Sequence, residues 1–149
     1  MKEHSEWKMP YEPDPKYAKR VAYMCMEFGI DQALKLYSGG LGYLAGSHMR
    51  SAYQLKQNMI GIGMLWRYGY YDQQQDMYGN MIADFKRKYY TFLQDTGIIV
   101  DVYIKKYAVK VKALYLAPEI FGTVPMYFLT TDIPENDGLS RSIMYRLYH

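Results

Sequence analysis

The sequence has 149 residues, of which 50% are hydrophobic and 22% are charged, and its formal net charge is +3. This length and composition are those of one globular domain and exclude a disordered chain. The short basic runs lie beside acids and form no basic stripe with interleaved aromatic residues, which argues against nucleic-acid binding.

The single cysteine, Cys25, excludes an internal disulfide. It lies in an apolar run, as expected of a small core residue in a reducing compartment. The chain has no stretch of 18 apolar residues and no charged-then-apolar signal sequence, so we expect no membrane span. These observations together predict a cytoplasmic protein.

Residues 1–20 form a polar lead-in whose three prolines, Pro10, Pro13 and Pro15, are expected to exclude regular structure around them. Residues 21–29, VAYMCMEFG, form a short apolar run that is bounded by charge and by glycine. That pattern predicts a buried strand.

A helix and a second strand are predicted next. Apolar residues between Leu41 and Leu55 recur at spacings of three and four, which indicates an amphipathic helix that runs to about Gln57. Residues 58–66, NMIGIGMLW, then predict another buried strand. A strand, a helix and a strand in succession form a β-α-β unit, which favours parallel strands and a right-handed crossover.

The pattern changes after Asp72. Residues 72–80, DQQQDMYGN, are typical of a polar turn. Residues 97–116 alternate apolar and polar side chains, which predicts a hairpin with one solvated face. Residues 124–132, VPMYFLTTD, predict a further strand, and the turn-rich residues 132–138 close it.

The last residues, RSIMYRLYH, place Ile143, Met144, Leu147 and Tyr148 at helical spacing, and no stop signal or polar tail follows them. The end therefore looks cut, and we expect its apolar side chains to be left open. Exposed apolar patches drive association. We accordingly expect a homo-oligomer, or an exchange of the C-terminal segment between copies.

The stretch YSGGLGYLAG, residues 37–46, holds four glycines in ten positions. Glycine within an element costs roughly 0.5–1 kcal/mol relative to alanine, so the stretch needs a reason. One is a tight turn with positive φ, and the other is a backbone that comes close to a ligand. A strand that leads through glycines into a helix presents unpaired N–H groups, which favour an anion. The spacing matches neither G-x-G-x-x-G nor a P-loop, so a purely structural turn stays an alternative.

Residues 21–55, followed by IGIGMLWRYGYYDQ, VPMYFLTTDIPEND and the closing RLY, resemble the N-terminal part of the α-glucan phosphorylases. These are the glycogen, starch and maltodextrin phosphorylases, and the likeness is greatest to their shorter bacterial branch. It runs from about Val21 to Tyr148 with the motifs in the same order. The resemblance implies that residues 21–149 are an incomplete N-terminal domain of a GT-B glycosyltransferase. That domain is α/β and partly Rossmann-like, with a mostly parallel sheet and an added β-hairpin region.

The resemblance also implies an activity for the full-length enzyme. Such an enzyme transfers the terminal α-1,4-linked glucosyl unit of a glucan to inorganic phosphate, which gives glucose 1-phosphate. The family's cofactor is pyridoxal phosphate, whose phosphate group is an acid/base partner for the substrate phosphate. The family's cofactor lysine and most substrate contacts lie downstream, so no catalytic residue is predicted in this chain. We expect the chain alone to be inactive.

In the family the glycine loop is a backbone clamp at the phosphate and the glucosyl unit. Preorganised N–H donors aimed at a group that develops charge suit that role. Carried over to this sequence, the clamp comprises Ser38, Gly39, Gly40, Leu41 and Gly42. No metal site is predicted.

Three further residues are candidates to line the cleft. Glu27 matches the acid of the family's MEFG motif, where it either lines the cleft or caps a turn. Arg67 either meets a phosphate or carboxylate bidentately or forms a structural ion pair. His48 matches the histidine of the family's AGDH motif, but Ser47 replaces the acid before it, and a lone histidine on a helix is often only structural. Asp132 is expected to fix a loop conformation.

Other functions stay open. A glycogen or starch synthase-like glycosyltransferase carries a similar K-T-G-G-L-G-D-V loop, but Tyr37 and Ser38 replace its Lys-Thr here. A non-catalytic glucan-binding or regulatory remnant would keep the fold without the chemistry, and the 18 tyrosines would allow stacking on sugars. A dinucleotide-binding domain is disfavoured by the glycine spacing.

Overall fold

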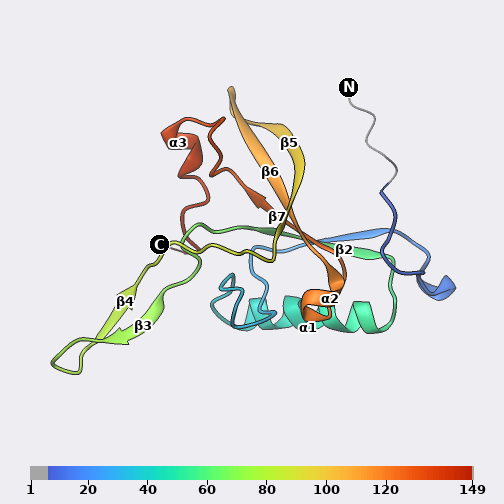
Figure 1. Ribbon diagram of the computed structural model, residues 1–149, viewed down its shortest axis with the longest axis horizontal. Coiled ribbons are helices and arrows are strands. Elements are labelled where there is room, and N and C mark those ends of the chain that lie inside the picture. The colour runs from blue at the N-terminus through green and yellow to red at the C-terminus, as the bar shows by residue number, and fades with distance from the viewer. Residues whose placement is uncertain (1–6, 149) are drawn as a thin grey trace.

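The computed structural model describes residues 7–148, which form an α/β fold around a five-stranded mixed sheet with a separate two-stranded hairpin (Figure 1). The strand order in the sheet is β1-β2-β7-β6-β5. In chain order the elements are the 3-10 helix η1 (Pro15–Tyr17), β1 (Val21–Met24), α1 (Gly40–Gln54), β2 (Met59–Met64), β3 (Asp72–Gln75), β4 (Met81–Asp84), β5 (Gln94–Ile104), β6 (Tyr107–Leu116), α2 (Pro118–Phe121), β7 (Met126–Thr130) and α3 (Gly138–Arg141).

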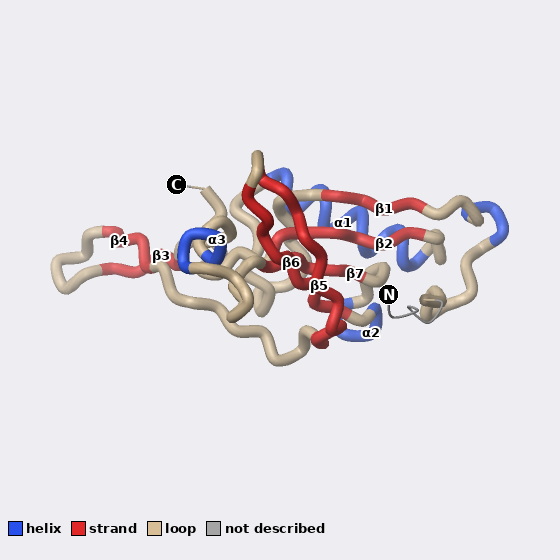
Figure 2. The backbone as a smooth tube through the Cα atoms, turned by 90° about the horizontal axis from the view of Figure 1, so that it is seen from above, coloured by secondary structure: helices blue, strands red, loops and turns tan. Residues whose placement is uncertain are grey.

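The predicted β-α-β unit is confirmed, but the expectation that its first strand is buried is wrong, because β1 lies at the edge of the sheet and is largely exposed. Strand β1 pairs in parallel with β2, and α1 connects them. Strand β7 then pairs in parallel with the other side of β2, so three parallel strands lie side by side (Figure 2). Each element is shorter than predicted: β1 ends at Met24, and α1 ends at Gln54 because Lys56 takes a φ of 50°, which a helix cannot continue.

The second half of the sheet is antiparallel. Strands β5 and β6 form the predicted hairpin, and β6 pairs antiparallel with β7. On β6, Val109, Val111 and Ala113 are buried while the lysines between them are half-exposed, as the alternating pattern predicts. The expectation of a mostly parallel sheet therefore holds only for β1, β2 and β7, and the sheet as a whole is mixed.

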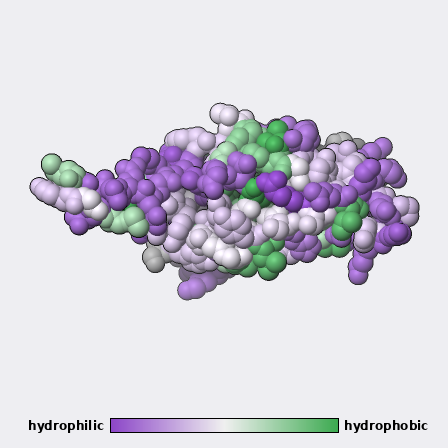
Figure 3. Space-filling model, turned by 90° about the horizontal axis from the view of Figure 1, so that it is seen from below, coloured by the Kyte–Doolittle hydropathy of each residue, from purple (hydrophilic) through white to green (hydrophobic). Residues whose placement is uncertain are grey.

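The region predicted as a polar turn, residues 72–80, is instead the first strand and the tip of the β3–β4 hairpin. A polar sequence forms strands here because the hairpin projects from the body and buries neither face (Figure 1). Its tip carries two exposed apolar side chains, Met77 at 87% and Tyr78 at 81%, and green atoms lie among paler ones at that end of the surface in Figure 3.

The predicted lead-in carries one regular turn, so the expectation of no regular structure around its prolines is wrong at Pro15. That residue begins η1, and the carboxylate of Asp14 accepts a hydrogen bond from the Lys16 N–H at 2.8 Å. Proline is tolerated there because the first helical N–H would be unpaired anyway. Residues 1–6 of the lead-in lie outside the described part of the chain.

The C-terminal residues do not continue a helix, because α3 ends at Arg141. Their backbone instead bonds to the chain that leaves β2: Met144 accepts from the Arg67 N–H at 3.0 Å, and Leu147 donates to the carbonyl of Gly69 at 3.0 Å. Met144 and Leu147 are thereby buried, at 7% and 0% exposure. The expectation that they are left open is wrong, whereas Ile143 is 44% exposed as expected.

Three glycines explain how closely α1 approaches the chain that leaves β1. The N–H of Gly29 donates to the carbonyl of Gly42 at 2.8 Å. A Cβ on Gly46 would lie 2.1 Å from the carbonyl oxygen of Gly29, and a Cβ on Gly42 would lie 2.4 Å from the Cβ of Tyr37. No glycine of the stretch has positive φ, so the tight-turn explanation is wrong. Close backbone packing accounts for two of its four glycines.

We expect Gly46→Ala to lower the free energy of unfolding by about 1–3 kcal/mol, because the new methyl group would meet backbone that has to shift. Gly40→Ala is the matched control on the same helix, since a Cβ at Gly40 meets nothing within 4 Å. Its unfolding free energy should stay within about 0.5 kcal/mol of the parent value. Urea unfolding monitored by circular dichroism measures both variants. Equal stabilities would contradict the packing explanation.

Candidate functional site

The carboxyl ends of the three parallel strands bring candidate residues from distant parts of the sequence to one edge of the sheet. Glu27 follows β1, Arg67 follows β2 and Asp132 follows β7. Open α/β sheets bind ligands outside the carboxyl ends of their parallel strands. This edge is therefore the candidate functional site, and the glycine stretch borders it at the start of α1.

Glu27 is a buried carboxylate, with only 2% of its surface exposed. Its Oε2 accepts hydrogen bonds from the N–H of Ser38 at 2.9 Å, the hydroxyl of Ser38 at 3.3 Å and the N–H of Gly39 at 3.4 Å. Its Oε1 accepts a hydrogen bond from the hydroxyl of Tyr148. A buried charge needs such donors, because it has lost its hydration. Glu27 thus orders the loop ahead of α1 from within.

These contacts decide the charge of Glu27. Burial by itself raises the pKa of a carboxyl group, but hydrogen bonds from Tyr148, Ser38 and Gly39 stabilise the anion and together lower the pKa of Glu27 below its ordinary 4.5. The hydrogen bond between Tyr148 and Glu27 also raises the pKa of the Tyr148 phenol, and it is the largest cause of that rise. Glu27 is therefore ionised at neutral pH, while Tyr148 keeps its proton and donates.

The five predicted clamp residues do not all face outward. The N–H groups of Ser38 and Gly39 point at Glu27, and Gly42 is buried beside that carboxylate. Gly40 and Leu41 are exposed, and no side chain caps the start of α1. Since the first N–H groups of a helix have no acceptor within it, those of Gly40 and Leu41 are the donors left for a ligand.

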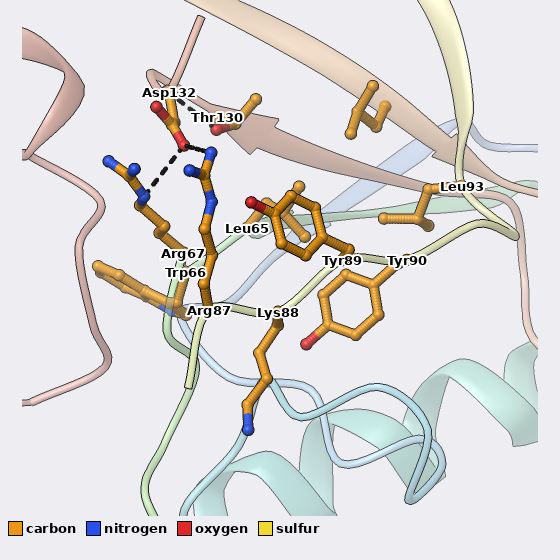
Figure 4. Close-up of a pocket in the computed structure, with 11 residues that line it drawn as sticks. Leu65, Trp66, Arg67, Arg87, Lys88, Tyr89, Tyr90, Leu93, Thr130 and Asp132 are labelled. Carbon is orange, nitrogen blue, oxygen red and sulfur yellow. Dashed lines mark hydrogen bonds and ion pairs between the residues drawn. The ribbon is translucent and has the colours of Figure 1, made fainter. Parts of the chain in front are cut away.

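Asp132 is surrounded by three arginines. Its Oδ2 lies 2.7 Å from Nη2 of Arg87 and 3.2 Å from Nε of Arg67 (Figure 4). Its Oδ1 lies 2.9 Å from Nε of Arg141. The side chain of Asp132 is 10% exposed and that of Arg67 is 20% exposed, whereas Arg87 and Arg141, each 37% exposed, reach solvent. Arg67 thus forms the structural ion pair that was one of its two predicted roles, and Asp132 ties together the segments after β2, after β4 and in α3.

A cavity of about 260 Å³ lies beside this cluster (Figure 4). Arg67, Arg87, Lys88 and Asp132 line its charged part. The rest of its wall is aliphatic and aromatic, and comprises Leu65, Trp66, Tyr89, Tyr90, Leu93 and Leu114, with Thr130 beside Asp132. A second cavity, of about 920 Å³, lies between residues 7–13 and the start of β1 and β2. The glycine stretch lines neither.

The remaining predicted site residue, His48, does not reach this edge. It is exposed on α1, and its ring packs edge-on against Tyr23 with centroids 4.9 Å apart. Sequence reasoning missed Tyr148, Arg87 and Arg141, because no local pattern links them to Glu27 or Asp132. Among residues 7–148 no group of three His, Cys, Asp or Glu side chains is arranged to hold a metal ion, and no helix is long and apolar enough to cross a membrane.

Comparison with known proteins relates the chain to one segment of longer proteins. It is 36% identical over 143 residues to the maltodextrin phosphorylase of Thermococcus litoralis, and this alignment covers 91% of the chain but 17% of that protein. It is 34% identical over 142 residues to the glycogen phosphorylase of Mycobacterium tuberculosis, covering 86% of the chain and 16% of that protein.

It is also 55% identical over 130 residues to an uncharacterized protein of Methanocaldococcus jannaschii, covering 87% of the chain and 25% of that protein. The chain therefore spans between about a sixth and a quarter of the length of these relatives. No protein-family profile matches it. The similarity supports a phosphorylase-related segment.

We expect Glu27→Gln to destabilise the fold at pH 7 by about 1.5 kcal/mol or more, because the charged acceptor of the loop is lost. The pKa of Glu27 is lowered in the folded state, so its stabilisation is present above pH 4.5 and is lost as the pH falls through the folded pKa. The gap between parent and variant should close at acid pH. Urea unfolding at several pH values measures it.

Two further variants serve as controls for Glu27→Gln. Tyr148→Phe removes one donor and should raise the pKa of Glu27, so that acid unfolding begins at higher pH. Glu135→Gln removes an exposed carboxylate on the turn after β7 and should change stability little. A Glu27→Gln gap that is independent of pH would contradict the role given to the ionised carboxylate.

Proposed function

We propose that this chain is the N-terminal part of an α-glucan phosphorylase, an enzyme that transfers the terminal α-1,4-linked glucosyl unit of a glucan to inorganic phosphate. The observation that carries the proposal is the similarity to maltodextrin and glycogen phosphorylases over 86–91% of the chain. In this proposal the parallel half of the sheet belongs to a Rossmann-like domain of the GT-B type, and the rest of the enzyme lies outside the 149 residues.

The start of α1 supplies the proposed contact with substrate. The N–H groups of Gly40 and Leu41 have no acceptor within the helix, and a Cβ at Gly39 or Gly40 would meet nothing within 4 Å. A ligand can therefore come close to the backbone there. Donors held by a folded helix are already oriented when charge develops on a transferring group, which is what stabilises such a transition state.

The charge of Glu27 determines which part of the substrate lies near Ser38 and Gly39 and which part lies near Gly40 and Leu41. Its ionised carboxylate lies within 3.4 Å of the N–H of Gly39, so a second anion next to it would be repelled. The neutral glucosyl unit is therefore the part placed nearer Ser38 and Gly39. The phosphate lies beyond it, at the exposed amides of Gly40 and Leu41.

The cofactor of such an enzyme, pyridoxal phosphate, does not fit the residues that line the 260 Å³ cavity. A Schiff base needs a lysine free to lose its proton, whereas Lys88, the lysine that lines the 260 Å³ cavity, is ion-paired with Asp72. The proposal therefore leaves the cofactor, whose phosphate group would supply acid/base chemistry, to the part of the enzyme outside this chain. The chain contributes binding and orientation.

The test removes one N–H group at the start of α1 by a substitution with proline. Gly40 is the first residue of α1, a position at which proline is tolerated. We expect Gly40→Pro, made in the reading frame that contains this sequence, to reduce phosphate-dependent release of glucose 1-phosphate about 10²-fold or more. Gly40→Ala keeps the N–H and should retain most of the activity.

Other outcomes overturn parts of the proposal. Equal activity of Gly40→Pro and Gly40→Ala would remove the backbone clamp, and a reading frame without a cofactor-bearing region would remove the enzymatic activity. In that second case, micromolar binding of maltooligosaccharides to the 149-residue chain in calorimetry would favour a non-catalytic glucan-binding role.

A further inference from the structure

We infer that the outer edge of β5 is an interaction surface for a second copy of this chain, whose own β5 pairs with it in antiparallel orientation. β5 is the last strand of the sheet, so its outer edge pairs with no strand of residues 7–148. The proposed function has no part in this inference, since the candidate site lies at the carboxyl ends of β1, β2 and β7. Three features of β5 carry it: the length of the open edge, its apolar side chains and the placement of its charges.

β5 lacks most of the features that protect an edge strand. Soluble proteins keep edge strands short or place lysine, proline or a bulge on them, because their unpaired N–H and C=O groups accept a foreign strand. β5 spans 11 residues and contains no lysine, arginine or proline. Its one irregularity lies between Asp95 and Ile99, and residues 99–104 beyond it pair regularly with β6. This regular half offers an unbroken edge to a second strand.

The regular half of β5 also leaves a row of apolar side chains open. Val100 and Val102 are paired with Val111 and Val109 of β6, so they extend the buried face of β6 outward. They are nevertheless 50% and 43% exposed, and Ile104 after them is 45% exposed. A strand added at this edge would cover part of the row, and the removal of apolar surface from water favours such an association.

The charges of β5 make the same strand of a second copy an acceptable partner. The acids of β5 are Asp95 and Asp101, and each forms an ion pair with a lysine of β6. The strand therefore brings no unpaired charge to the contact. Like charges directly opposite each other would still be destabilising, which excludes an antiparallel pair centred on Asp101.

A register centred on Val102 meets these conditions and uses residues 100–104 of the regular half. It places Val102 opposite Val102 of the second copy and Val100 opposite Ile104, so the two apolar rows meet. Asp101 then lies opposite Tyr103, and no like charges face each other. Such a contact is two-fold symmetric, so it closes with two copies and does not extend into a filament.

The first experiment is analytical ultracentrifugation of the 149-residue chain, in which we expect a reversible equilibrium between monomer and dimer. Val102→Lys places two ammonium groups opposite each other and removes an apolar pair, so it should weaken dimerisation about tenfold or more. Val21→Lys is the matched control, because it makes the same exchange on the other edge strand, β1, where Val21 is 41% exposed. It should change dimerisation less than about threefold. Circular dichroism confirms that each variant is folded.

Cysteine cross-linking tests the register in a Cys25→Ala background. Val102→Cys brings two thiols opposite each other, with Cβ atoms about 4.5–5.5 Å apart, and should give a disulfide-linked dimer on mild oxidation. Val100→Cys lies on the same face and should not, because the two copies of residue 100 are offset by four residues, or about 13 Å. Equal cross-linking of the two variants would overturn the register.

Two other outcomes would overturn the surface itself. A chain that stays monomeric at hundreds of micromolar would leave the edge of β5 to another part of the longer protein. Equal weakening by Val102→Lys and Val21→Lys would indicate a head-to-tail contact between the two opposite edges of the sheet, in place of the symmetric pair.

Discussion

The close contact between α1 and the chain that leaves β1 is the constraint on which the candidate site depends. Gly46 has room for no Cβ because the carbonyl of Gly29 would lie 2.1 Å from it, and Gly42 accepts the N–H of Gly29. A larger residue at these positions would push the helix away from the sheet. The carboxylate of Glu27 would then no longer reach the amides of Ser38 and Gly39, and the start of α1 would lose its ordering acceptor.

The C-terminal segment links the ends of two parallel strands. It bonds to the chain after β2 through Met144 and Leu147, and Tyr148 then donates to Glu27 after β1. Asp132 adds the end of β7 through its contacts with Arg67 and Arg141. Residues up to 121 positions apart in the sequence thus hold one edge together, which explains why Met144 and Leu147 are buried.

The sequence predicted the elements whose burial pattern is local and left out those decided by distant contacts. Periodicity located α1, β2 and β6, because each buries one regular face. It misplaced residues 72–80, whose strands bury nothing, and residues 142–148, whose backbone pairs with another segment instead of forming a helix.

Composition located the glycine stretch, but only the three-dimensional structure separates Gly42 and Gly46, which allow close packing, from Gly39 and Gly40, which face open space. The role of Arg67 could not be predicted from the sequence either, because Asp132, with which it forms an ion pair, is 65 residues away.

The two charged centres at this edge differ in how fully they are satisfied. Glu27 accepts from four donors, has its pKa lowered and is buried, so it is a completed internal anion that orders the loop. Asp132 is the reverse case, because one carboxylate is shared by three guanidinium groups, of which those of Arg67 and Arg87 line a cavity. The negative charge of Glu27 repels a further anion, whereas the excess of guanidinium groups around Asp132 attracts one. The charge therefore changes along this edge, from a negative charge fully satisfied by donors at Glu27 to an excess of positive charge around Asp132.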